Sequence, residues 1–160
     1  MQYINAANIH LGKLLQMKDE RFSEAVDRIC RVDSRYASDS YEFISDAVTY
    51  TVKKLSRNKK PRGERHVTGH ELVEGVAEYA VEQFGPLAGN VLSDWGVTGG
   101  MDIGNIVYNL IGEGLLYASD DDKKEDFEGA DDIISNRLAA AAKPAALSPS
   151  KSKKAPVIIE

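Results

Sequence analysis

The stretch VTGHELVEGVAEYAVEQFGP, residues 67–86, carries the clearest fold signal in this chain. Thr68 and Glu71 have the spacing of a capping box, in which each side chain satisfies a free backbone N–H at the start of a helix. Val67 and Leu72 occupy the two positions of a hydrophobic staple. Gly85-Pro86 ends the pattern, because glycine adopts the left-handed cap and proline starts a new segment. We therefore predict a helix whose buried face carries Leu72, Val76, Tyr79, Ala80 and Phe84.

Two amphipathic stretches precede this helix. Asp39 and Glu42 have the capping-box spacing, and the apolar stripe that follows predicts a helix over about residues 39–56. An earlier apolar face predicts another helix; it comprises Phe22, Ala25, Val26, Ile29 and Cys30.

A polar and aromatic cluster separates these two helices. It contains Asp33, Arg35, Tyr36 and Tyr41. We expect an Asp33–Arg35 pair to fix the turn between the helices, with contact to a ligand as the alternative.

Two further helices are predicted after Pro86. The first contains Trp95 and ends at Gly96, and the second is capped by Asp102 and ends at Gly114. The sequence thus predicts a mainly α, compact helical domain of about five helices. Residues 115–119 and 125–128 could then pair as a small β-hairpin, which would make the C-terminal half winged-helix-like.

The composition divides the chain into three parts. We predict a variable leader at residues 1–17, with some helical spacing, and a helical globular domain at 18–132. Residues 133–160 are predicted to be a disordered tail rich in Ala, Pro, Ser and Lys, because such residues bury too little surface to offset chain entropy.

The charges are strongly segregated although the formal net charge is only −5. One basic segment holds Lys53, Lys54, Arg57, Lys59, Lys60, Arg62 and Arg65, against the single acid Glu64. Residues 67–122 contain no Lys or Arg. Because phosphate binding depends on Lys and Arg, DNA binding through a winged-helix surface in this half is disfavoured. Nucleic acid binding through the 53–65 loop and the basic tail stays as an alternative function.

Chemical motifs for catalysis are missing from the sequence. It has no phosphate-binding GxxxxGK, nucleophile elbow, HExxH or dinucleotide fingerprint, so we expect no enzyme activity and no cofactor, with an unrecognised enzyme as a further alternative. His66 and His70 lack a third metal ligand, and we predict no metal site. An anion at the helix start after Arg65 would compete with Glu71 for the same N–H groups.

Three features bear on partners and location. Trp95 is either a core residue or an exposed anchor for a partner, and the apolar end Val157, Ile158 and Ile159 could dock as a tethered peptide. The single cysteine, Cys30, excludes an internal disulfide, and no stretch approaches the length of a membrane span. We expect a cytoplasmic protein with a protein partner and no membrane association.

The sequence also resembles a known family over about residues 20–129. The resemblance rests on Asp33-Ser34-Arg35-Tyr36, Tyr41-Glu42-Phe43, Arg65-His66-Val67-Thr68-Gly69, Glu82-Gln83-Phe84-Gly85-Pro86-Leu87-Ala88, Trp95-Gly96-Val97 and Ile106-Val107-Tyr108-Asn109-Leu110. These motifs are similar to those of the Minf-type family of uncharacterised bacterial proteins. That resemblance implies a bacterial source and no particular activity. From the residues themselves we predict a non-catalytic protein–protein interaction or adaptor module.

Overall fold

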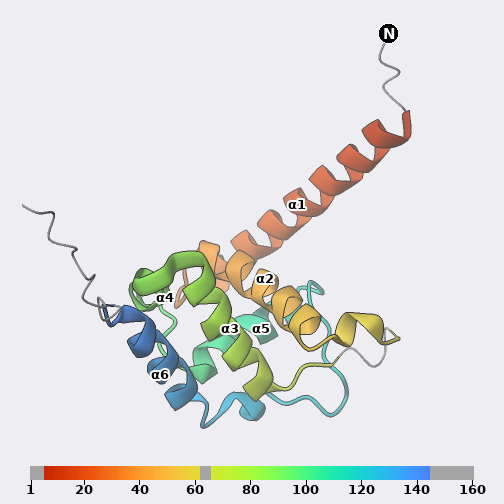
Figure 1. The fold of residues 1–160 in the computed structure, drawn as a ribbon. Coiled ribbons are helices and arrows are strands. Elements are labelled where there is room, and N and C mark those ends of the chain that lie inside the picture. The colour runs from red at the N-terminus through yellow and green to blue at the C-terminus, as the bar shows by residue number, and fades with distance from the viewer. Residues whose placement is uncertain (1–5, 62–65, 145–160) are drawn as a thin grey trace, which may run out of the picture.

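A computed structural model describes residues 6–61 and 66–144, and in these ranges the protein is mainly α-helical (Figure 1). The α-helices are α1 (Ala6–Val32), α2 (Ser38–Lys54), α3 (Gly69–Phe84), α4 (Ala88–Asp94), α5 (Gly100–Gly112) and α6 (Asp131–Ala142). Short 3-10 helices are η1 (Arg57–Lys59), η3 (Gly85–Leu87) and η4 (Lys124–Phe127).

Helix α3 lies at the centre of the body and packs against α2, α4 and α6 (Figure 1). The predicted capping box is confirmed, since the Glu71 backbone N–H donates to Thr68 Oγ1 at 3.2 Å and the Thr68 N–H donates to Glu71 Oε2 at 3.0 Å. The predicted buried face is also present, with Leu72, Val76 and Ala80 in the core.

The approach of α2 to α3 depends on a glycine. A Cβ atom at Gly75 would lie 1.8 Å from Thr51 Oγ1, a distance at which atoms overlap. The Thr51 hydroxyl is itself buried and donates to the Ala47 carbonyl of its own helix at 2.7 Å. The two backbones therefore meet at a residue pair with no space for an added methyl group.

The predicted β-hairpin is wrong. The described residues contain no strand, and residues 115–123 run as an irregular loop that ends in η4. Its polar groups are satisfied by local turns instead of a strand ladder, because the Ser119 N–H donates to Asp122 at 2.7 Å and the Lys123 N–H donates to Asp126 at 2.9 Å. Leu115 and Leu116 are both half-buried against the core and do not alternate in and out as strand residues do.

The ends of the domain also differ from the predicted boundaries. Helix α1 runs without a break from Ala6 through the expected leader into the body. At the other end, α6 covers residues that were expected to begin the tail, and its Ile134 is 2% exposed. Helix α6 thus extends ten residues past residue 132, and its packed residues run to Leu138. None of the helices in the described ranges is long and apolar enough to cross a bilayer.

A glycine exchange should test the α2–α3 contact. We expect Gly75→Ala to lower the free energy of unfolding by about 1–3 kcal/mol, the usual cost of overpacking a filled core. Gly112→Ala is the matched control, because a Cβ there meets no atom and alanine favours helix by up to about 1 kcal/mol. Urea unfolding of both variants measures the difference; equal stability would show that Gly75 is not a close contact.

Candidate functional site

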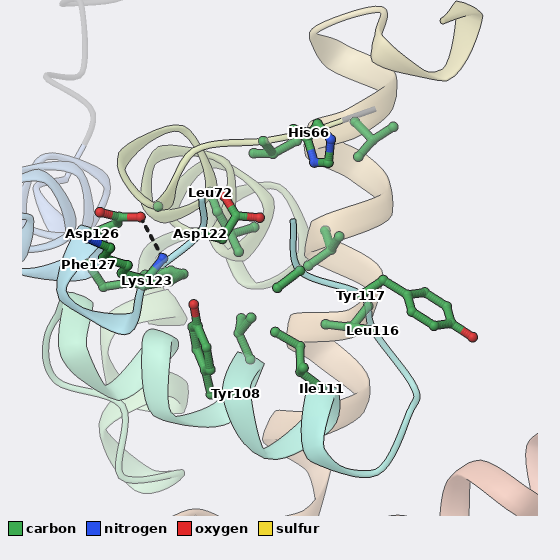
Figure 2. Close-up of a pocket in the computed structure, with 16 residues that line it drawn as sticks. His66, Leu72, Tyr108, Ile111, Leu116, Tyr117, Asp122, Lys123, Asp126 and Phe127 are labelled. Carbon is green, nitrogen blue, oxygen red and sulfur yellow. Dashed lines mark hydrogen bonds between the residues drawn. The ribbon is translucent and has the colours of Figure 1, made fainter. Parts of the chain in front are cut away.

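A pocket lies between α2, the start of α3, α5 and the 115–127 segment (Figure 2). Its volume is about 110 Å³. Its apolar walls comprise Val48, Val52, Val67, Leu72, Val107, Ile111, Leu116 and Phe127. These side chains come from elements that are distant in sequence, so periodicity within one helix could not reveal the pocket.

Tyr108 places a polar group in this apolar pocket. Figure 2 shows its hydroxyl pointing from α5 into the space beneath Lys123 and Asp126. The oxygen is buried and has no hydrogen-bond partner among the described residues. Burial, assisted by the nearby acids Asp122 and Asp126, raises the pKa of Tyr108. The hydroxyl thus keeps its proton at neutral pH and is a donor that lacks an acceptor.

The rim of the pocket is acidic on the side of the 115–127 segment. Asp122 and Asp126 line the opening beside Lys123, and Asp120 and Asp121 are exposed next to them. Tyr117 also borders the pocket, but its ring points outward into solvent and is 92% exposed (Figure 2). The opening therefore combines negative charge with one exposed aromatic ring.

Part of the predicted basic patch is neutralised by acids of α3. Lys54 forms an ion pair with Glu78, and Arg57 forms one with Glu71 at 3.1 Å. Arg57 also donates to the backbone carbonyl of His66. Burial alone would raise the pKa of Glu71, but the Thr68 N–H and Arg57 outweigh it and lower that pKa. The charged Glu71 accepts from the Thr68 N–H and from Arg57 at the start of α3, where an external anion would have to bind.

The other basic residues are exposed or lie outside the described residues. Lys53, at the end of α2, and Lys59 and Lys60, around η1, are exposed. Arg62 and Arg65 lie outside the described residues, as do Val157, Ile158 and Ile159 of the tail.

Trp95 faces the interior of the protein. It is half-buried, with its ring centroid 5.4 Å from that of Phe43 and 5.7 Å from that of Phe84. This aromatic packing matches the core alternative for Trp95 and leaves little of it to serve as an anchor.

The two histidines are not joined in one site. His70 lies in the first turn of α3, where its Nε2 is 3.2 Å from the Glu128 carbonyl, and His66 precedes the helix. Across the described ranges, no group of three or more His, Cys, Asp or Glu could hold a metal ion.

The predicted Asp33–Arg35 pair is present and belongs to a larger polar network. The Arg35 guanidinium donates to both Asp33 oxygens, at 2.9 and 2.8 Å. The side-chain amide of Asn109 on α5 donates to Asp33 at 3.0 Å and to the Tyr41 hydroxyl at 3.1 Å. The Arg35 bonds, helped by Asn109 and opposed by burial, hold the pKa of Asp33 well below its usual range.

A second branch of the network joins Tyr36 to α5. The Tyr36 hydroxyl donates to Asp102 at 2.7 Å and accepts from Asn105 at 2.8 Å. Burial and the bond to Asp102 raise the pKa of Tyr36 to about 12. Burial opposes ionisation of Asp102, but donors from Tyr36, Thr98 and Gly99 lower its pKa overall. These contacts satisfy nearly all the polar groups they bury, which indicates a structural role.

Acid should weaken this network. Because the pKa values of Asp33 and Asp102 are lower in the folded chain than in the unfolded one, their stabilisation is present at neutral pH and is lost as the pH falls below about 4. We expect Asp33→Asn to be less stable at pH 7 and to show a shallower loss of stability in acid. Urea unfolding midpoints from neutral to acid pH measure both effects, with the exposed Asp94→Asn as control; an acid slope unchanged by Asp33→Asn would contradict the assignment.

No protein-family model, curated protein or solved structure matches this chain. The resemblance to the Minf-type family accordingly stays a prediction.

Proposed function

We propose that this protein is a non-catalytic interaction module that receives an apolar side chain of a protein partner in the pocket between α2, α5 and the 115–127 segment. The partner is proposed to meet it in the bacterial cytoplasm. The location rests on the single cysteine, Cys30, and on the family resemblance.

The buried Tyr108 hydroxyl is the observation that carries the proposal. A buried donor without a partner costs about 1–3 kcal/mol, so it is retained only where something compensates for it. A backbone or side-chain carbonyl of a bound segment would accept its hydrogen bond. The pocket walls would at the same time cover the apolar side chain next to that carbonyl.

The size of the pocket favours a side chain over a small-molecule ligand. Cofactor and drug-sized sites usually enclose about 300–1,000 Å³. The volume here is about 110 Å³, which is enough for an aliphatic side chain or a small ring. This comparison supports an interaction module over an enzyme.

The charge at the opening favours a basic partner segment. Five acids stand at or beside the rim, against Lys123 and Lys124; they are Asp120, Asp121, Asp122, Glu125 and Asp126. A partner with Lys or Arg near its apolar anchor would be attracted, and a phosphate backbone would be repelled. The alternative of nucleic acid binding through the 53–65 loop gains no support here, because Lys54 and Arg57 are already paired with acids.

Removing the Tyr108 hydroxyl should leave the free energy of unfolding unchanged while it removes the proposed donor to the partner. We expect Tyr108→Phe to be as stable as the wild type or slightly more stable, because the lost hydroxyl has no partner. Tyr36→Phe is the matched control and should lose about 1–3 kcal/mol, since it leaves Asp102 and Asn105 without their shared partner. Urea unfolding measures both; a Tyr108→Phe loss as large as that of Tyr36→Phe would mean that the hydroxyl is satisfied within the fold.

Site-specific photo-crosslinking should capture the partner. With a benzophenone amino acid in place of the exposed Tyr117, we expect a discrete protein adduct in the native cells that survives nuclease treatment. The same probe at Leu87, which is exposed beyond α3, should give no such adduct.

The adduct must also depend on the pocket. Adding Val52→Phe, which fills the pocket from α2, or Tyr108→Phe should reduce its yield severalfold. An adduct that is insensitive to both changes, or that contains only nucleic acid, would refute the proposed docking site.

A further inference from the structure

The pocket at Tyr108 selects for three properties in a ligand. Its walls favour an aliphatic side chain, and the buried Tyr108 hydroxyl requires a hydrogen-bond acceptor. The acidic rim favours Lys or Arg close to that side chain. Figure 2 shows the hydroxyl directed into the space beneath Lys123 and Asp126, where a peptide carbonyl would meet it. These requirements rest on the docking site proposed above, and one segment of the chain itself meets all of them.

That segment is KSKKAPVII, residues 151–159. Three lysines precede three aliphatic residues within it; they are Lys151, Lys153 and Lys154, and Val157, Ile158 and Ile159. Backbone carbonyls beside the aliphatic residues would supply the acceptor for Tyr108. The other parts of the chain outside the described residues lack one of these properties. Residues 1–5 contain no Lys or Arg, and residues 62–65 contain no apolar side chain.

The charges of the segment complement those at the pocket opening. Residues 151–159 carry three lysines and no acid. At the opening, Asp122 and Asp126 accept backbone N–H groups that hold the turns of the loop. Asp120 and Asp121 beside them are exposed. Lysines of the segment would therefore meet exposed carboxylates without disturbing the loop.

The chain is long enough to bring this segment to the pocket. Phe127 lines the pocket, and α6 begins shortly after it (Figure 1). Even with the connecting residues fully extended, Ala142 at the end of α6 lies at most about 32 Å from Phe127. The chain from Ala142 to Ile158 spans up to about 53 Å. The connection thus reaches the pocket with length to spare for passing around the domain.

We propose that the apolar run 157–159 of this chain docks in the Tyr108 pocket of the same molecule, with Lys153 and Lys154 at the acidic rim. A connection of this length gives an effective concentration on the order of 1 mM. A contact with a dissociation constant of about 0.1 mM would then be about 90% formed. A protein partner must displace the segment, so the segment raises the partner concentration that binding requires.

Photo-crosslinking of the purified full chain tests this contact, with the benzophenone probe in place of Tyr117. We expect a link from position 117 to the tryptic peptide that contains residues 157–159, identified by mass spectrometry. In a mixture of isotopically light and heavy chains, the link should join residues of one isotopic form, as an intramolecular contact requires.

Variants at both ends of the contact should lower the yield of the link severalfold. Ile158→Asp together with Ile159→Asp changes the segment, and Val52→Phe fills the pocket. Leu147→Ser is the matched control, because it removes an apolar residue of the connection outside residues 151–159. It should leave the yield unchanged.

A charge exchange tests the rim. Lys153→Glu together with Lys154→Glu should weaken the link. Adding Asp120→Lys and Asp121→Lys to that variant should restore it, because opposite charges then meet again. An absence of rescue would contradict the placement of the lysines at the rim.

Failure of this contact is distinguishable from failure of the proposed partner. A purified chain that gives no link, a link between different isotopic forms, or a yield insensitive to the Ile158 and Ile159 changes would overturn the inference, even where a partner adduct forms in cells. A link in the purified chain without any partner adduct would support the inference and refute the protein partner. Where both form, the Ile158 and Ile159 changes should raise the partner adduct severalfold, and an unchanged adduct would contradict competition for the pocket.

Discussion

Three polar side chains fix the rotation of α5 about its own axis. Asp102, Asn105 and Asn109 fall at helical spacing on one face of α5, and each bonds a side chain from the segment between α1 and α2. Turning α5 by one residue, about 100°, would move all three away from these partners and leave buried polar groups unpaired. The network thus selects one orientation of α5, which hydrophobic packing alone would not do as sharply.

That orientation determines what α5 presents on its other sides. Ile103, Ile106 and Leu110 enter the core, and Tyr108 and Ile111 face the pocket. The opposite wall of the pocket is an irregular loop and not a helix. Local turns and the half-buried Leu115 and Leu116 hold this 115–123 loop in place. In the proposed docking site, the helical wall would hold the Tyr108 donor in place, and the loop wall would adjust to the side chain of the partner.

Two signals that lie within a few residues of sequence are confirmed, the Thr68–Glu71 cap and the Asp33–Arg35 pair. The predicted Asp39–Glu42 cap is wrong, because α2 begins at Ser38 after Ala37 and has no side-chain cap. Contacts between distant segments could not be predicted from local sequence patterns. Nothing near Tyr36 indicates Asp102 or Asn105 as its partners. The walls of the Tyr108 pocket come from four separate segments. The hairpin prediction failed because a short apolar run before an acidic turn fits a strand and a packed loop equally well. Helix α6 was missed because its alanines were interpreted as tail composition, although Ile134 anchors it to the core.

The polar network holds α5, and with it the pocket, in place. Amide hydrogen exchange measured by NMR on the wild type and on Asn105→Ala tests this dependence. In the variant we expect the α5 amides to lose protection and the resonances of Tyr108 and Ile111 to shift, while α6 keeps its protection. Unchanged α5 protection, or an equal loss in every helix, would contradict it, because α5 would then owe its position to the apolar core alone.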